Sequence, residues 1–103
     1  MPKPQLKIVK PDELRKLFND GGYAHRVKAG EFTTKVIRQA PPGPKIRAKE
    51  PPGTMSQIIA YIDAGGKVIA IVHQYLRPDG GLGGSGRPDP KRLLLNGVLY
   101  ETR

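Results

Sequence analysis

The stretch SQIIAYIDAGGKVIAIVHQYLR, residues 56–77, decides the fold, because two apolar runs meet there at a glycine turn. The runs are rich in Ile, Val and Tyr, which fit a pleated sheet, and the glycines at 65 and 66 supply the positive φ angles of a tight reversal. These signals predict a β-hairpin with a three-residue loop, and the loop sets the register. The expected pairs are Asp63 with Lys67, Ile62 with Val68, Tyr61 with Ile69, and Gln57 with His73.

Both faces of this hairpin are apolar, so it belongs in the middle of a sheet that is covered on each side. Side chains alternate between the faces of a strand, which divides the residues into two sets. One expected face comprises Ile58, Ala60, Ile62, Val68, Ala70 and Val72. The other comprises Ile59, Tyr61, Ile69, Ile71, His73 and Tyr75.

The charge of the chain indicates the kind of partner. Its 103 residues contain 18 Lys and Arg against 9 Asp and Glu, a formal net charge of +9. A chain of this length fits one domain, residues 1–103. The positive balance favours nucleic acid, RNA more than DNA, or an acidic protein as partner, and the alternative is a basic protein that is merely soluble. The sequence leaves the oligomeric state open.

Several classes of protein are disfavoured by composition. With no cysteine and two histidines, the chain offers no disulfide framework and too few ligands for a zinc or iron site, so we expect no metal and no cofactor. It has no signal-peptide core and no run near the ~20 apolar residues of a membrane span, so we expect a cytoplasmic protein without a membrane partner. Its 11 prolines and 13 glycines require long extended or turning segments.

The N-terminal third is expected to hold a helix and a second hairpin. Residues 1–10 fit a basic arm or an edge strand equally well. Residues 11–19 predict a two-turn helix that begins at a proline and has acidic residues in its first turn. Residues 23–28 and 31–38 then predict a hairpin with one apolar side, which includes His25. The other side would carry a candidate phosphate-binding set, Arg26, Lys28, Lys35 and Arg38.

Residues 40–53, APPGPKIRAKEPPG, read as a crossover between the hairpins, because their prolines favour an extended polyproline conformation. Lys45, Arg47 and Lys49 alternate along this segment. In an extended chain they would share one face at a spacing of about 6 to 7 Å, suited to a phosphate backbone. A solvated crossover without a ligand is the equal alternative.

Residues 77–90 are expected to form a glycine-rich loop, followed by a short helix over residues 89–97. A hairpin that turns at residues 96–97 is the alternative. Residues 81–86 match G-x-G-x-x-G, but too little chain follows for a dinucleotide-binding unit. The loop glycines could still bind an anion through their N–H groups, and the alternative, which composition alone favours slightly, is a mobile surface loop. The cations beside this loop are Arg77, Arg87, Lys91 and Arg92.

Chemistry is expected where the central hairpin ends. His73 and Tyr75 share one face, and Arg77 follows them. Imidazole titrates near neutrality and a guanidinium stabilises anionic transition states, a combination suited to a metal-independent ribonuclease. His25 could supply a second acid or base. For each histidine, a packed and hydrogen-bonded side chain is the alternative.

Together these elements predict an α+β fold, a single small domain with an antiparallel sheet of about four to six strands and one or two short helices. A helix before an antiparallel sheet in a small basic chain resembles the barnase and RelE type of ribonuclease toxin in topology. No motif of that family is matched, so the resemblance assigns no residue.

Three functions remain as hypotheses. The first is RNA binding, and the second is a toxin-like endoribonuclease that uses His73 as acid or base without metal. The third is a structural protein of a ribonucleoprotein or phage particle. The expected nucleic-acid-binding residues are Arg26, Lys28, Lys35, Arg38, Lys45, Arg47, Lys49, Arg77, Arg87, Lys91 and Arg92.

Overall fold

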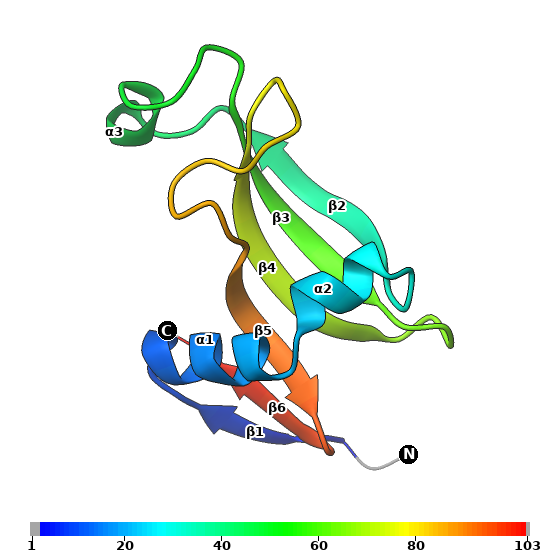
Figure 1. The fold of residues 1–103 in the computed structure, drawn as a ribbon. Coiled ribbons are helices and arrows are strands. Elements are labelled where there is room, and N and C mark those ends of the chain that lie inside the picture. The colour runs from blue at the N-terminus through cyan, green and yellow to red at the C-terminus, as the bar shows by residue number, and fades with distance from the viewer. Residues whose placement is uncertain (1–2, 103) are drawn as a thin grey trace.

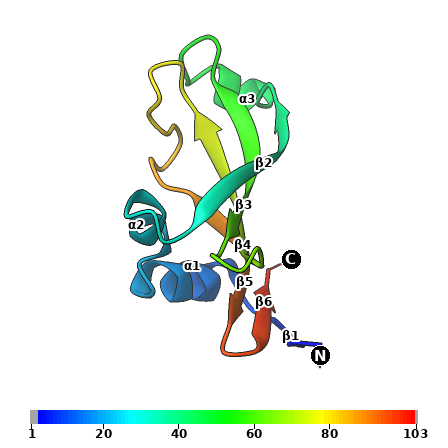
Figure 2. The same ribbon diagram turned by 90° about the vertical axis from the view of Figure 1, so that its right-hand side faces the viewer.

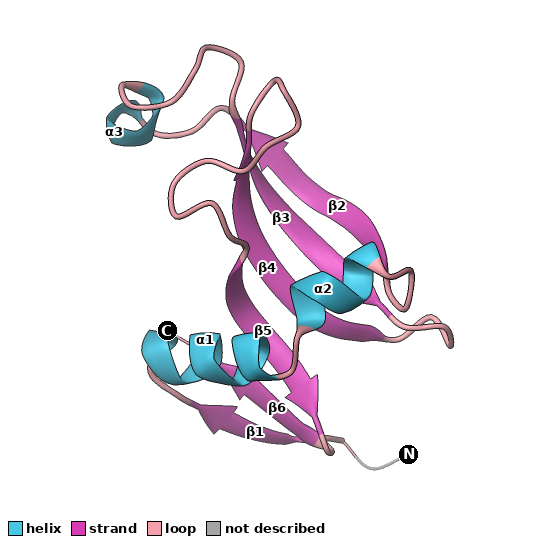
Figure 3. Cartoon of the chain, in the orientation of Figure 1, coloured by secondary structure: helices cyan, strands magenta, loops and turns pink. Residues whose placement is uncertain are grey.

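Within residues 3–102, the part of the chain that the computed structural model describes, six strands form one sheet in the order β1-β6-β5-β4-β3-β2. The sheet is antiparallel except for the parallel pair β1 and β6, and three short helices accompany it (Figures 1 and 3). This is the α+β fold that the sequence predicts. The elements are β1 Gln5–Ile8, α1 Pro11–Asp20, α2 Tyr23–Lys28, β2 Thr33–Ala40, α3 Pro44–Arg47, β3 Met55–Ile62, β4 Val68–Leu76, β5 Asp89–Leu95 and β6 Val98–Glu101.

The central hairpin is confirmed, and its strands β3 and β4 lie inside the sheet with a neighbour on each side. Its register begins as expected, with Ile62 opposite Val68. A β-bulge beside Tyr61 then shifts the pairing by one residue, so that Tyr61 faces Ala70 instead of Ile69. The expected pairing of Gln57 with His73 is therefore wrong, because a one-residue shift exchanges the faces of a strand. Gln57 pairs with Gln74, and Ile58 pairs with His73.

One face of the sheet is covered by α1 and α2, as Figure 2 shows from the side. Leu14 and Phe18 of α1 pack there against Val72 and Leu93, and all four side chains are almost completely buried. The opposite face, called here the open face, carries Ile58, which is only half-buried. Within the described residues, neither a helix nor a second layer covers this face, and a partner is the third kind of cover that two apolar faces predict.

Helix α1 confirms the first predicted helix. Pro11 occupies its first turn, where the missing N–H costs nothing, and two acidic residues in that turn complement the helix dipole. Leu14 and Phe18 lie four residues apart and therefore share the buried face.

The predicted hairpin over residues 23–38 is wrong in its first half, because Tyr23–Lys28 forms the helix α2. Tyr23 and Val27 fit the two-residue period of a strand and the four-residue spacing of a helix equally well. Gly22 decides for the helix, since its φ of 64° turns the chain back at the end of α1. The expected cationic side is consequently divided between two elements, with Arg26 on α2 and Lys35 on β2.

The crossover, residues 40–53, contains the one-turn helix α3 instead of a continuous polyproline segment. Its N–H groups at Arg47 and Ala48 donate to the carbonyls of Gly43 and Pro44 at 2.9 and 3.0 Å. The expected row of three cations in an extended chain is therefore wrong, because a helical turn separates their directions.

The predicted helix over residues 89–97 is wrong, because Asp89–Leu95 forms the strand β5, and the alternative hairpin that turns at Asn96 and Gly97 is confirmed. Both turn residues have positive φ angles, 51° and 76°, as a two-residue hairpin loop of this sequence requires. Pro90 is tolerated because it lies at a bulge near the start of β5.

Of the two predictions for residues 1–10, the edge strand is confirmed, because β1 pairs with β6 at the edge of the sheet.

Among the described residues, no helix is both long and apolar enough to cross a membrane.

We expect Leu93→Ala to lower the free energy of unfolding by about 2 to 5 kcal/mol, because the change leaves a cavity at a fully buried position. The neighbouring Leu94 is half-buried on the opposite face, so Leu94→Ala is the matched control and should cost less. Urea unfolding of both variants measures the difference. Equal losses would contradict the assignment of the covered face.

Candidate functional site

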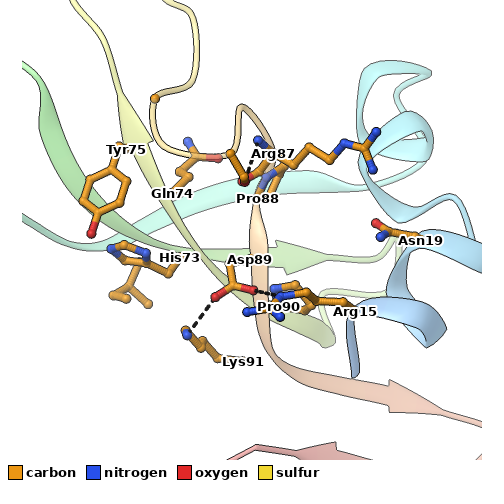
Figure 4. Close-up of a pocket in the computed structure, with 13 residues that line it drawn as sticks. Arg15, Asn19, His73, Gln74, Tyr75, Arg87, Pro88, Asp89, Pro90 and Lys91 are labelled. Carbon is orange, nitrogen blue, oxygen red and sulfur yellow. Dashed lines mark hydrogen bonds and ion pairs between the residues drawn. The ribbon is translucent and has the colours of Figure 1, made fainter. Parts of the chain in front are cut away.

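The histidine pocket is an open cavity of about 790 Å³ beside the end of β4. It lies where β4 and β5 stop pairing, since His73 and Asp89 are the last paired residues of the two strands. Beyond this point the glycine-rich loop borders β4, and α1 contributes from the covered side (Figure 4). The lining residues are Arg15, Asn19, Ile58, His73, Gln74, Tyr75, Gly83, Ser85, Arg87, Pro88, Asp89, Pro90 and Lys91.

His73 is half-buried and held by two neighbours on the open face. Its Nε2 atom forms a 2.8 Å hydrogen bond with Ser56 Oγ, and its ring meets the Tyr75 ring edge-on at 4.7 Å between centroids. Burial lowers the pKa of His73 from 6.5, the positive charge of Lys91 lowers it further, and Asp89 opposes this in part. The imidazole is therefore mainly neutral at pH 7 and available as a base.

Asp89 is the acidic residue of the pocket and is paired on both sides. Its Oδ1 accepts from Arg15 Nε at 3.0 Å, and its Oδ2 accepts from Lys91 Nζ at 2.9 Å. Burial acts to raise the pKa of Asp89, but the hydrogen bonds from Lys91 and Arg15 outweigh it and the pKa is lowered. Arg15 also pairs with Asp12 at 2.8 Å, and Arg87 lines the pocket without an ion-pair partner among the described residues. Among the lining residues, three cations thus accompany one carboxylate. The pocket has a net positive charge and can attract an anion.

Arg77, expected to contact phosphate, is engaged elsewhere. Its guanidinium donates to both oxygens of Glu50 at 2.9 to 3.1 Å, and the Glu50 side chain is only 5% exposed. The N–H of Gly84 donates to Glu50 Oε1 at 2.7 Å. The carboxylate thus fixes the glycine loop to the segment after α3, and we call these contacts the Glu50 clamp.

Three of the loop glycines donate their N–H groups to acceptors of the same chain. Gly84 donates to Glu50, Gly81 to Asp79, and Gly83 to the Tyr75 carbonyl. A Cβ atom at Gly83 would collide with the Glu50 carboxylate, so the close approach needs glycine there. The loop is held by specific contacts.

The other expected cations are dispersed. Arg87 and Lys91 line the histidine pocket, whereas Arg92 pairs with Glu101 on the neighbouring strand. Arg26 is paired with Glu31 and lies over the rings of Tyr23 and Phe32. Arg38 lies on the open face in one cross-strand row with Ile58 and His73. Lys28 is on α2, Lys35 on β2, and Lys45, Arg47 and Lys49 are on or beside α3.

The structure does not place the two histidines in one pocket. His25 is exposed on α2 and lines a second cavity, called here the apolar pocket, between α2, β2, β3 and the glycine loop. Of the four residues expected to be catalytic, His73 and Tyr75 share a pocket, and Arg77 and His25 lie outside it.

Sequence reasoning missed three members of the site. Arg15 belongs to the predicted helix over residues 11–19, Ser56 to the predicted central hairpin and Asp89 to the predicted helix over residues 89–97, and none of the three is a predicted site residue. No local signal identifies them, because they come from α1, β3 and β5 and meet only through the fold.

No family model, curated protein or solved structure matches this chain.

We expect Glu50→Gln to destabilise the protein at pH 7 and to reduce its sensitivity to acid. The hydrogen bond from Gly84, followed by that from Arg77, lowers the pKa of Glu50. A lowered folded-state pKa gives stability above the unfolded value of about 4.3 that is lost as pH falls through the folded value.

Urea unfolding of wild type and variant between about pH 3 and pH 7 measures this effect. Glu13→Gln, which changes an exposed carboxylate on α1, is the control. Parallel stability curves for wild type and Glu50→Gln would contradict a role for the clamp.

Proposed function

We propose that the protein binds RNA, with a phosphate of the backbone held in the histidine pocket. The observation that carries the proposal is that Arg15, Arg87 and Lys91 line the same pocket as a half-buried imidazole, in a chain of net charge +9. Protein cations supply most of the affinity for nucleic acid, and a concave cationic surface concentrates the attraction.

The open face extends this surface towards β2. Arg38 is exposed and lies two strands from His73 in the same row, so their backbones are separated by roughly 10 Å. Ion pairs within the described residues leave Lys35, Arg38 and Arg87 unengaged. A strand of RNA that crosses from Arg87 to Arg38 would pass His73 and Tyr75.

RNA affinity should fall by about 100-fold between about 50 and 300 mM salt, the loss expected for four phosphate contacts with a single strand. Arg87→Gln should weaken binding and reduce the slope of log affinity against log salt by about 0.7, the share of one phosphate contact with a single strand. Lys67→Gln, at the exposed turn between β3 and β4, is the matched control and should change neither. Fluorescence anisotropy with labelled RNA provides the measurement, and a salt-independent affinity would contradict the proposal.

A second candidate function is RNA cleavage without a metal, and the environment of His73 favours it. The neutral imidazole could take the proton of a ribose 2′-OH, and the 2′ oxygen would then attack the adjacent phosphorus. The bond to the 5′ oxygen breaks, and that oxygen receives a proton from a donor in the pocket such as Tyr75. Arg87 and Lys91 would stabilise the negative charge on the phosphorane. The products are a 2′,3′-cyclic phosphate and a 5′-hydroxyl.

This candidate predicts that RNA is cleaved in the presence of EDTA, while DNA of the same sequence stays intact because it lacks the 2′-OH. His73→Ala should lower the rate by about 10² to 10⁴-fold, the usual contribution of a general base. Lys67→Gln, which lies outside both pockets, is the control and should have little effect. Gel analysis with detection of the cyclic phosphate gives the rate. RNA that is bound but never cleaved excludes the nuclease and leaves the binding proposal intact.

A further inference from the structure

The apolar pocket has the size and lining of a small-molecule site. Its volume is about 680 Å³, within the roughly 300 to 1,000 Å³ of such sites. The side chains of Tyr23, Val27, Val36 and Ile59 supply apolar walls from α2, β2 and β3. Neither Asp nor Glu lines this pocket, whereas Arg87 does. A flat, neutral group attached to an anion fits these properties.

The apolar pocket continues into the histidine pocket. Four residues line both cavities, namely Asn19, Gln74, Arg87 and Pro88. In β4, His73 points to the open face and Gln74 to the covered face, since successive side chains alternate. A ligand with an anionic part beside His73 can therefore place a second part beyond Gln74.

A row of three carboxamides orients Gln74 at this junction. Gln74 Nε2 donates to Gln57 Oε1 at 2.9 Å, and Gln57 Nε2 donates to Gln39 Oε1 at 2.6 Å. Gln57 is 5% exposed and is fixed by both bonds. Within the described residues, no hydrogen bond reaches Gln74 Oε1, which leaves this acceptor and one N–H available. A carboxamide with both functions can bind the edge of a nucleobase.

We propose that the apolar pocket receives an unpaired nucleobase of the RNA whose phosphate lies in the histidine pocket. This inference rests on the proposed function. RNA-binding proteins commonly recognise single strands by accepting splayed bases into apolar sites and contacting their edges by hydrogen bonds. An apolar side chain of a protein partner could contact the apolar walls of the pocket. It would leave the free carboxamide groups of Gln74 and the charge of Arg87 without a partner.

The test measures by NMR titration how tightly the full chain binds each of the four nucleoside monophosphates and ribose 5-phosphate. Nucleotides that use both pockets should bind at least about tenfold more tightly than ribose 5-phosphate, which corresponds to about 1.4 kcal/mol. They should also shift the amide signals of Val36 and the side-chain signals of Gln74, whereas ribose 5-phosphate shifts only the signals of the histidine pocket.

Val36→Trp is designed to fill the apolar pocket without disturbing the core. Val36 is 48% exposed on the edge strand β2, where an aromatic residue is well tolerated. The variant should lose the preference for nucleotides and keep its affinity for ribose 5-phosphate. Val68→Trp is the matched control, because Val68 is 46% exposed and lies outside both pockets. It should bind as wild type does.

Two results would overturn the inference while leaving RNA binding intact. One is RNA binding that depends on Arg87 together with equal affinities for nucleotides and ribose 5-phosphate. The other is tighter binding of N-acetyltryptophanamide than of any nucleotide, which would assign the pocket to a protein side chain. Failure of RNA and of all phosphates to bind would instead remove the proposed function itself.

Discussion

The burial of one sheet face under α1 and α2 is the constraint on which the rest of the structure depends. Phe18 and Leu14 need apolar partners, and Val72 and Leu93 provide them from neighbouring strands. The β-bulge beside Tyr61 determines which residues of β4 take part, because one extra residue exchanges the two faces. With the bulge, Val72 is buried and His73 points away from the helices. The bulge thus places Val72 in the core and His73, the next residue, in the histidine pocket.

The sequence predicts those elements whose signals are local and have one meaning. The central hairpin and α1 are such cases, since a glycine turn between apolar runs and a proline before acidic residues rarely occur elsewhere. The strand prediction for Tyr23–Lys28 is wrong because Tyr23 and Val27 satisfy both periodicities, and the left-handed conformation of Gly22 decides for the helix. The strand β5 was misread as a helix, because its Asp-Pro start imitates a helix cap while the turn at Asn96 and Gly97 belongs to a hairpin.

From the sequence, only those site residues that are close together in the chain could be predicted to lie together. His73 and Tyr75 were identified because two residues on one strand face are neighbours, and Arg87 and Lys91 because they flank the loop. Arg15 and Ser56 enter from distant elements, and spacing in the sequence does not reveal them. Arg77 shows the opposite error, a predicted site residue that the fold engages elsewhere. Its charge suggested a phosphate contact, but Glu50, 27 residues earlier, neutralises it in the folded chain.

The Glu50 clamp gives Arg77 a structural part beside the histidine pocket. By holding Gly84, the carboxylate fixes a loop whose neighbours Gly83, Ser85 and Arg87 form one wall of the histidine pocket. A loop so rich in glycine would otherwise lose much conformational entropy when a ligand orders it. Because the clamp orders it during folding, less of the binding energy is spent at the pocket. Under the proposed function, Arg77 would therefore affect phosphate binding only indirectly, through the shape of the wall that carries Arg87.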